Sequence, residues 1–335
     1  MKILLSKELK PYNSFSINQN AELILQADSV QDLIDIWSDE TYSDMIKLPL
    51  GAGSNTLFCT AFNGVVVLNR IYGKSVIETE EEYFLKVSSG EDWPSLVEWC
   101  VDNGLSGIEN LAMIPGCAGT APIQNIGAYG VEISSVIESV TCYNFSTKQI
   151  ETLTKAECDF SYRHSIFQTK QYLILSVQFR FHKLFKPDLS YPSLVQFLER
   201  ENISSSNISP AKLSTYIQAI RESKLPSPNV IPNVGSIFKN PIVESDSIDL
   251  DFLKGHRWDT SEGQIKLSAA RLLETVMPSI NIPPSLGFYE KHSLVLINRG
   301  GAVFSEVIKL LKDIQDKVRS LYGIDLEIEP EILGS

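Results

Sequence analysis

A tyrosine and a permanently charged arginine stand side by side at Tyr162-Arg163. The guanidinium group is a planar fork of donors that matches a carboxylate. Lys224 stands at the end of a segment that we expect to be helical, where a cation is favourable in any case. For both basic residues, an ordinary solvated side chain is the alternative to a binding role.

Ser236 and Glu331 are two further candidates. Ser236 follows Gly235 in the run NVGSIFKNP. A serine in such a turn usually caps the backbone, and no histidine is close in sequence to indicate a nucleophilic triad. Glu331 is the last of four acids that alternate with apolar residues from Asp325 onward. This period of two is typical of a half-buried strand. Spacing alone therefore makes Glu331 one of four acids on the solvent-exposed face of that strand.

The run GLSGIENLAMIPGCAGTAPIQNIGAYG at 104–130 carries no charge from Leu111 to its end. Its prolines and glycines exclude a single long helix or strand. A buried irregular backbone must still satisfy its N–H and C=O groups. The glycines at 116, 119, 127 and 130 would let this chain approach a polar ligand that accepts such bonds. A tight crossing of the core without a ligand is an equal alternative.

The run GAGSN at 51–55 follows a segment that we expect to be a strand. Thr56 occupies the place of the third glycine in the GxGxxG fingerprint, which disfavours a nicotinamide-binding Rossmann domain. The amides of this run could still form an anion-binding nest for a pyrophosphate. An ordinary tight turn is the alternative.

The segment IPGCAGTAPIQNIGAYG resembles the flavin-binding segment of UDP-N-acetylenolpyruvoylglucosamine reductases, the flavin enzymes that make UDP-N-acetylmuramate for peptidoglycan. Four further motifs occur in the family's order: GAGSN at 51–55, YRHSIF at 162–167, GSIFKNP at 235–241 and EPEI at 329–332. The resemblance therefore extends from near the start of the chain to its last few residues. The spacer before YRHSIF, and Tyr191 after it, resemble the longer of the family's two variants.

The resemblance implies a role for each matched residue. FAD would be bound by Gly51, Ala52, Gly53, Ser54, Asn55, Pro115, Gly116, Cys117, Gly119, Thr120, Gln124, Asn125, Gly127 and Ala128. Arg163 and Glu331 would act at the enolpyruvyl carboxylate, with Ser236 as the proton donor. The substrate would be bound by Tyr162, Tyr191, Lys224 and Asn240, the last two at its diphosphate. Trp258 stands near a position where the family often has tyrosine, and it is left unassigned.

The implied activity is the NADPH-dependent reduction of UDP-N-acetylglucosamine enolpyruvate to UDP-N-acetylmuramate through bound FAD. We expect FAD to bind without a covalent link, because residues 111–130 contain no histidine and Cys117 is expected to be a packing thiol. Two alternatives stay open. One is another FAD-dependent oxidase or dehydrogenase on the same scaffold, and the other is a non-catalytic nucleotide-sugar binding module.

The composition narrows the class of protein. At 335 residues the chain is long enough for two or three domains. Its net charge of −12 argues against nucleic acid or an acidic membrane surface as a partner. The start lacks a signal-peptide core and no run approaches a membrane span. Five cysteines without a CxxC pair indicate reduced thiols, and four scattered histidines make a metal site unexpected. We expect a cytoplasmic monomer.

The hydrophobic periodicity predicts an α+β protein. Strands are expected at 21–25, 45–50, 64–69, 83–88, 136–145, 172–182 and 293–298, with a last strand from 324. Helices are expected after the Asp28-Ser29 cap, around 93–101, and at 210–222, 266–277 and 304–322. By resemblance, the fold is the two-part FAD-binding scaffold of the vanillyl-alcohol-oxidase type plus a substrate-binding domain. The expected domains are 1–70, 71–224 and 225–326, with 327–335 returning to the flavin-binding part.

Overall fold

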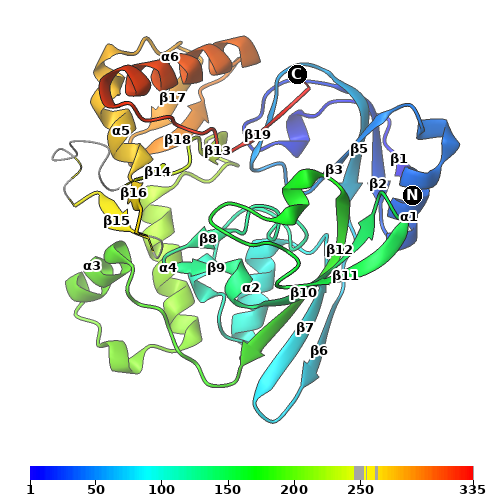
Figure 1. The fold of residues 1–335 in the computed structure, drawn as a ribbon, viewed down its shortest axis with the longest axis horizontal. Helices are drawn as coiled ribbons and strands as arrows, with labels where there is room; N and C mark the ends of the chain where they lie inside the picture. The colour runs from blue at the N-terminus through cyan, green and yellow to red at the C-terminus, as the bar shows by residue number, and fades with distance from the viewer. Residues whose placement is uncertain (245–252, 254, 261–262, 335) are drawn as a thin grey trace. The chain divides into compact units, whose positions relative to one another are not determined.

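The computed structural model describes residues 1–244, 253, 255–260 and 263–334. The chain forms two compact units, and each draws on more than one part of the sequence (Figure 1). The first unit comprises Met1–Ser6, Leu23–Ala52 and Gly64–Ser223. The second comprises Lys7–Glu22, Gly53–Asn63 and Lys224–Ser335.

This grouping differs from the three-part division expected from the sequence. The expected boundary at 224/225 lies one residue from the start of the second unit's main segment. The expected boundary near 70 lies inside the first unit, and two N-terminal segments group with the C-terminal residues instead. The division into three domains therefore remains a proposal.

The first unit contains a four-stranded sheet in the order β1-β2-β5-β3. Its strands are β1 (Lys2–Ile3), β2 (Ala21–Ala27), β5 (Phe62–Asn69) and β3 (Ile46–Leu50). Helix α1 (Val30–Ser38) begins at Ser29, whose side chain accepts a hydrogen bond from the Asp32 amide. Leu33 and Ile36 of this helix are fully buried, in one core with Val65 and Val67 of β5. Apolar spacing on α1 therefore fixes which face covers the sheet.

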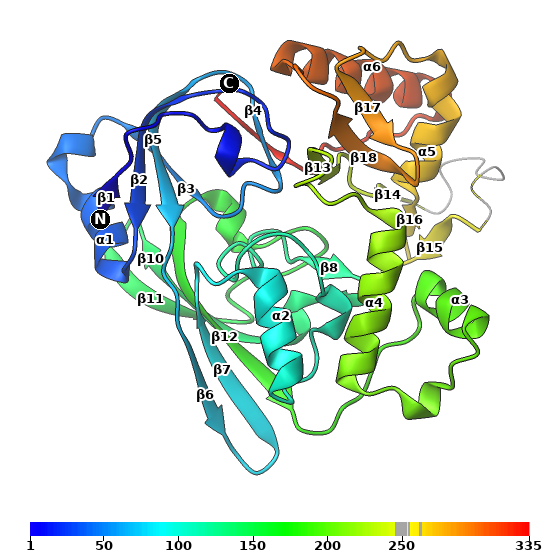
Figure 2. The same ribbon diagram turned by 180° about the vertical axis from the view of Figure 1, so that it is seen from behind.

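A five-stranded antiparallel sheet forms the larger part of the first unit, in the order β11-β10-β12-β7-β6. Its strands are β6 (Lys74–Glu78), β7 (Glu82–Ser88), β10 (Ile137–Asn144), β11 (Gln149–Thr154) and β12 (Tyr172–His182). Three helices contribute to the same core: α2 (Trp93–Asp102), α3 (Pro192–Arg200) and α4 (Pro210–Lys224). Figure 2 shows α2 next to β12 and β7 of this sheet, with α4 on the other side of α2.

The irregular segment that follows α2 is held to this core. Trp93, fully buried, donates its indole N–H to the carbonyl of Leu111 at 3.0 Å. Beyond it, β8 (Gly127–Ala128) and β9 (Val131–Glu132) form a short antiparallel pair. The predicted ligand-binding segment is therefore an ordered crossing of the first unit.

The second unit contains two three-stranded sheets and one parallel pair. The first sheet has the order β13-β18-β17, with β13 (Asn233–Ser236), β18 (His292–Asn298) and β17 (Leu286–Tyr289). The second has the order β14-β16-β15, with β14 (Ile242–Val243), β16 (Ile265–Leu267) and β15 (Arg257–Asp259). The parallel pair joins β4 (Thr56–Phe58) to the C-terminal β19 (Glu331–Leu333). Helices α5 (Ala269–Val276) and α6 (Phe304–Tyr322) complete the unit.

Most of the expected elements are confirmed, and two boundaries are wrong. The helix expected at 266–277 begins at Ala269, because Ser268 caps it and Ile265–Leu267 pairs as a strand. The strand expected from 324 begins at Glu331. Before it, residues 324–327 alternate between buried and exposed, and among the described residues this stretch pairs through one isolated bridge, between Ile328 and Phe238. None of the described helices is long and apolar enough to cross a membrane.

Candidate functional site

The two segments predicted to bind a cofactor meet in the first unit. A Cβ placed on Gly51 would lie 2.8 Å from Cγ2 of Thr120 and 2.9 Å from Sγ of Cys117. Carbon atoms do not pack at such distances, because interiors are already close-packed. Glycine at position 51 therefore allows the loop after β3 to rest directly on residues 117–120.

These segments present amides that the protein itself does not use. The backbone N–H groups of Gly51, Ala52 and Gly116 have no hydrogen-bond acceptor within the residues that the structure describes. Consecutive free amides at the end of a strand form a nest that attracts an anion. The residues present thus fit the pyrophosphate of a dinucleotide such as FAD.

Other glycines of the segment are also required by the packing of the protein. The Gly119 amide donates to the Ser89 carbonyl at 2.9 Å, and a Cβ at this position would lie 2.5 Å from Cβ of Ser89. A Cβ at Gly130 would lie 2.9 Å from a carboxylate oxygen of Asp188. Close approach of protein segments therefore accounts for these two glycines without a ligand.

Cys117 is a packing thiol in this segment. It is 6% exposed, and burial raises its pKa, with hydrogen bonds to Thr120 acting in the opposite direction. Oγ1 of Thr120 accepts from the Cys117 amide and donates to the Cys117 carbonyl. A thiol kept protonated is a poor nucleophile, so the geometry disfavours a covalent link at this atom.

Asn125 is completely buried and serves the structure of the first unit. Its Nδ2 donates to Glu132 at 2.8 Å and to the Ser161 carbonyl at 3.0 Å, while its Oδ1 accepts from the Ser134 amide. The other predicted cofactor residues of this segment differ in exposure. Pro115 is exposed, and Gly116, Thr120, Gln124, Gly127 and Ala128 are half-buried.

Arg163 lies at the tip of a tight turn that is closed by two hydrogen bonds between Ser161 and His164. Its φ of 54° is in the left-handed region, which a residue with a side chain rarely adopts. The guanidinium lies over the Tyr162 ring at 5.2 Å and points toward the Gly127 carbonyl, 3.4 Å from Nη2. Strained backbone of this kind concentrates at functional sites.

Tyr191 is close to the same group of residues. Its ring meets the Tyr129 ring edge-on at 5.3 Å, and it is 39% exposed. Burial of its hydroxyl raises the pKa of Tyr191, and the charge of Arg163 lowers it. Arg163, Tyr162, Tyr191 and the Gly127 carbonyl therefore form one neighbourhood within the first unit.

The second unit brings Ser236 and Glu331 together. The Glu329 amide donates to the Ile237 carbonyl, and the Lys239 amide donates to the Glu327 carbonyl, both at 2.9 Å. These two bonds flank the isolated antiparallel bridge between Phe238 and Ile328, and they place Ser236 and Glu331 at the same end of it, although the two residues are far apart in sequence. The Ser236 hydroxyl is half-buried and has no hydrogen-bond partner among the described residues.

The second half of GAGSN contacts the chain at this end of the bridge. Gly53 has a φ of 60°, and a Cβ there would lie 2.0 Å from the Tyr12 carbonyl oxygen. The Ser54 carbonyl accepts a long bond of 3.4 Å from the Ser14 hydroxyl. The Asn55 carbonyl accepts from the Glu331 amide at 2.9 Å. In the second unit these residues fix the backbone at Glu331.

The remaining predicted residues have ordinary surroundings. Lys224 is the last residue of α4 and is exposed. Oδ1 of Asn240 accepts from the Ala269 amide at 3.0 Å, so it satisfies the first amide of α5, beside the Ser268 cap. Trp258, 39% exposed on β15, has no assigned role.

Sequence reasoning missed Arg221 and Tyr129. Nη2 of Arg221 donates to the Met113 carbonyl at 3.2 Å, and the Tyr129 hydroxyl is its side-chain partner. A basic residue near the C-terminus of a helix is common, which is why the sequence alone gave Arg221 no distinct role. An arginine in the segment just before Lys224 was the only available signal.

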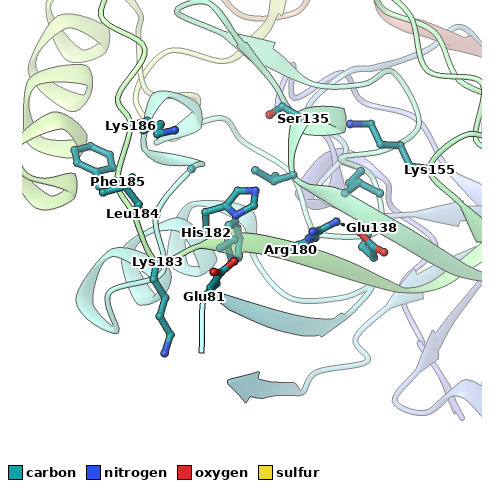
Figure 3. A pocket seen from close by; sticks show the side chains of 15 residues that line it. Glu81, Ser135, Glu138, Lys155, Arg180, His182, Lys183, Leu184, Phe185 and Lys186 are labelled. Carbon is teal, nitrogen blue, oxygen red and sulfur yellow. Dashed lines mark ion pairs between the residues drawn. The ribbon is translucent and has the colours of Figure 1, made fainter. Parts of the chain in front are cut away.

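A separate hollow of about 760 Å³ lies on the first unit and contains none of the predicted site residues (Figure 3). Its lining includes Arg180, His182 and Lys183 of β12 and the segment after it. Each of these three pairs with an acid: Arg180 and His182 with Glu82, and Lys183 with Glu78. Much of its charge is therefore already balanced by the protein.

Two family models match the chain. One is described as a FAD binding domain and matches residues 21–152. The other is described as the C-terminal domain of UDP-N-acetylenolpyruvoylglucosamine reductase and matches residues 226–333. The C-terminal match leaves no support for an oxidase of another kind or for a binding module without a flavin.

Full-length relatives carry the same name. The reductase of Aliivibrio fischeri is 49% identical, over 98% of this chain and 94% of the relative. That of Vibrio cholerae is 37% identical, over 100% of this chain and 96% of the relative. The crystal structure of the Thermus caldophilus reductase is similar over the full length of both chains, with a TM-score of 0.66 at 18% identity.

These findings confirm the fold class expected from the sequence, a FAD-binding scaffold of helices and strands followed by the C-terminal domain of the reductases. The chain belongs to the UDP-N-acetylenolpyruvoylglucosamine reductase family of FAD-dependent oxidoreductases.

Proposed function

We propose that the chain reduces the enolpyruvyl group of UDP-N-acetylglucosamine enolpyruvate to the lactyl group of UDP-N-acetylmuramate, with Ser236 as the proton donor. The observation that carries this role is the position of Ser236, which is half-buried, has a hydroxyl without a partner among the described residues, and lies at the same end of the Phe238–Ile328 bridge as Glu331. A hydroxyl without an internal partner can donate to a ligand.

The reaction adds a hydride and a proton across one carbon–carbon double bond. When bound, FAD supplies the hydride chemistry, with NADPH as the source of electrons. Hydride addition at C3 leaves negative charge at C2 of the substrate, and this charge is shared with the adjacent carboxylate. Arg163 stabilises that charge through its planar donors, and Glu331 orients the carboxylate and assists proton delivery.

Ser236 then donates its proton to C2. A serine hydroxyl is a very weak acid, so it protonates only a strongly basic partner. The carbanion or enolate at C2 is such a partner. Lys224 and Asn240 bind the diphosphate of the substrate, and Tyr162 and Tyr191 complete the substrate contacts.

The cofactor is proposed to be held without a covalent bond by the residues of 51–55 and 115–128. Two observations support this proposal: the amides of Gly51, Ala52 and Gly116 have no acceptor among the described residues, and burial raises the pKa of the Cys117 thiol. The chain is further proposed to be a monomer that does not bind nucleic acid. We also propose that it works in a reducing compartment such as the cytoplasm, because its five cysteines are all free.

The test is the purified full chain. It should be yellow, and acid precipitation should leave the yellow colour in the supernatant. NADPH oxidation should require UDP-N-acetylglucosamine enolpyruvate. A colourless protein would refute the proposed function, and a yellow pellet would refute the non-covalent link.

A further inference from the structure

Asn233 is a buried asparagine of the second unit to which the proposed reaction gives no role. It is 5% exposed and lies on β13, three residues before Ser236. Its backbone is bonded twice to Ser14. The Ser14 carbonyl accepts from the Asn233 amide at 3.0 Å, and the Ser14 hydroxyl donates to the Asn233 carbonyl at 2.7 Å. These two bonds hold the main chain at Asn233 without any help from its side chain.

The Asn233 side chain closes the turn that leads to Ser236. Its Oδ1 accepts from the Gly235 amide at 3.1 Å. Its Nδ2 donates to the Ile231 carbonyl at 2.9 Å and to the Pro226 carbonyl at 3.3 Å. An asparagine that bonds the backbone two residues further on forms an Asx turn. One side chain therefore joins the segment before β13 to the residue that precedes Ser236.

Gly235 has a left-handed backbone in this turn. Its φ is 72°, and a Cβ placed on it would meet no atom within 4 Å. The conformation of the chain, and not a lack of space, therefore favours a glycine at this position. The bond from the Gly235 amide to Oδ1 of Asn233 stabilises that conformation.

The turn adds an extra residue to β13. Asn233 lies opposite Ile297 of β18 and Ser236 lies opposite Val295, so two residues of β13 face one residue of β18. A left-handed glycine in such a β-bulge changes the direction of the side chains that follow. In a regular strand Ser236 would share a face with the buried Val234. With the bulge, the Ser236 hydroxyl is half-buried and has no partner among the described residues.

We propose that Asn233 is the positioning residue for Ser236: its side chain holds the bulge at Gly235, and the bulge directs the Ser236 hydroxyl toward the carbon that it protonates. The inference rests on the proposed function, in which Ser236 donates the proton. Proton transfer requires the donor within hydrogen-bonding reach of the acceptor. A displacement of about 1 Å can slow a reaction by roughly 10²-fold. Asn233 acts through Ser236 and is not itself a catalytic residue.

The test measures the two half-reactions of the FAD-containing enzyme by stopped flow in Asn233→Ala, which loses all three side-chain bonds. Asn233→Ser is the conservative variant, because a hydroxyl closes the same kind of turn more weakly. Asn298→Ala is the matched control. Asn298 is another buried asparagine of the second unit, and its Oδ1 accepts from the amide of Gly300, two residues further on, at 2.9 Å.

In Asn233→Ala we expect reoxidation of the reduced flavin by the enolpyruvyl substrate to be slower by roughly 10²-fold. In Asn233→Ser it should be slower by about tenfold, because the turn is held more weakly. Reduction of the flavin by NADPH and the affinity for the substrate should stay within about twofold of the wild type in both variants. Asn298→Ala should keep both rates, because its turn does not lead to Ser236.

A second measurement tests whether Asn233 acts through Ser236. In Ser236→Ala the hydroxyl is absent, so the addition of Asn233→Ala should slow reoxidation no further. Two independent effects would instead multiply. Multiplied losses in the double variant would show that Asn233 acts by another route, and the proposal would be wrong.

The proposal is also wrong if reoxidation in Asn233→Ala stays within about twofold of the wild type, or if Asn298→Ala slows it equally. Should Asn233→Ala not fold, Asn233→Ser decides: slower reoxidation supports the proposal, and a wild-type rate contradicts it. Failure of the proposed function is recognised separately, because Ser236→Ala alone would then reoxidise its flavin at the wild-type rate. That result would overturn both proposals, whereas a normal rate in the Asn233 variants alone overturns only this one.

Discussion

The first and second units position their predicted ligand-binding residues in different ways. In the first unit, main-chain contacts do the positioning: Gly51 rests on Thr120, and the Gly119 amide is bonded to Ser89. In the second unit, the candidate residues contribute side chains from short strands with irregular pairing. One of these, the Ser236 hydroxyl, has no partner among the described residues. Substitutions in the first group should therefore change stability and cofactor retention, and substitutions in the second should change turnover.

The largest effect is expected at Ser236. Ser236→Ala should lower turnover of the enolpyruvyl substrate by roughly 10²–10⁴-fold, the loss typical of removing a positioned acid. Ser236→Cys should keep more activity than alanine, because a thiol can also donate a proton. Steady-state NADPH oxidation measures both variants. If Ser236→Ala were as active as the wild type, Ser236 would be a turn residue and not the proton donor.

The second-largest effect is expected at Gly119 in the first unit, where the close packing of the protein should require a glycine. Gly119→Ala should cost about 3 kcal/mol of unfolding free energy, at the upper end for overpacking, because the new Cβ meets the Ser89 backbone. It should also release FAD. The control is Gly104→Ala, where a Cβ has open space and only a left-handed backbone is penalised, by about 1 kcal/mol.

Denaturant unfolding and flavin content measure both glycine variants. If Gly119→Ala unfolded like Gly104→Ala and kept its flavin, close packing would not be the reason for a glycine at 119.

A smaller effect is expected at Lys224. Removal of its charge in Lys224→Ala should weaken substrate binding by roughly 1.5–3 kcal/mol, the scale for a hydrogen bond to a charged group. Flavin content should not change. Lys212→Ala is the control, because Lys212 is an exposed lysine on the same helix. Loss of FAD with normal substrate affinity would contradict the role proposed for Lys224.

The smallest effect concerns the interior of the first unit at high pH. Burial and the nearby Glu109 carboxyl raise the pKa of the Cys100 thiol to about 12, while Lys74 lowers it. Below about pH 8.5, the ordinary pKa of a thiol, both folded and unfolded chains keep the proton and the stabilisation is complete. Above that pH the unfolded chain loses its proton first, so stability falls until the folded thiol also ionises.

At pH 9.5 this loss should be about 1.4 kcal/mol relative to pH 7.5. Urea unfolding of wild type and Cys100→Ala at the two pH values isolates it, because the variant lacks the thiol. Parallel losses in the two proteins would show that Cys100 stays protonated equally in both states.

Local pattern predicted much of the fold. The cap at Ser29 and the apolar spacing of α1, α4 and α6 could be read directly, as could the strands β2, β5 and β12. The pairing of β19 with β4 could not, because it joins residues 331–333 to residues 56–58 and depends on tertiary structure. For the same reason the sequence did not predict that residues 7–22 and 53–63 group with the C-terminal part.

The candidate site was predictable where it matched family motifs and unpredictable where long-range contacts define it. Family motifs identified Ser236 and Arg163 as candidates. No sequence pattern predicts the left-handed φ of Met113 or Tyr129. The buried Nε of Arg221, which has no hydrogen-bond partner among the described residues, is likewise a property of the folded surroundings. A cation at the end of a helix looks the same in sequence whether it is solvated or buried.

The most direct test of the contrast between the two units is a stopped-flow measurement of the two half-reactions in Ser236→Ala. Reduction of the bound flavin by NADPH should proceed at nearly the wild-type rate, since the cofactor segments of the first unit are unchanged. Reoxidation of the reduced flavin by the enolpyruvyl substrate should be slower by roughly 10²–10⁴-fold. Reoxidation at the wild-type rate, or equal slowing of both half-reactions, would contradict the assignment of proton donation to Ser236.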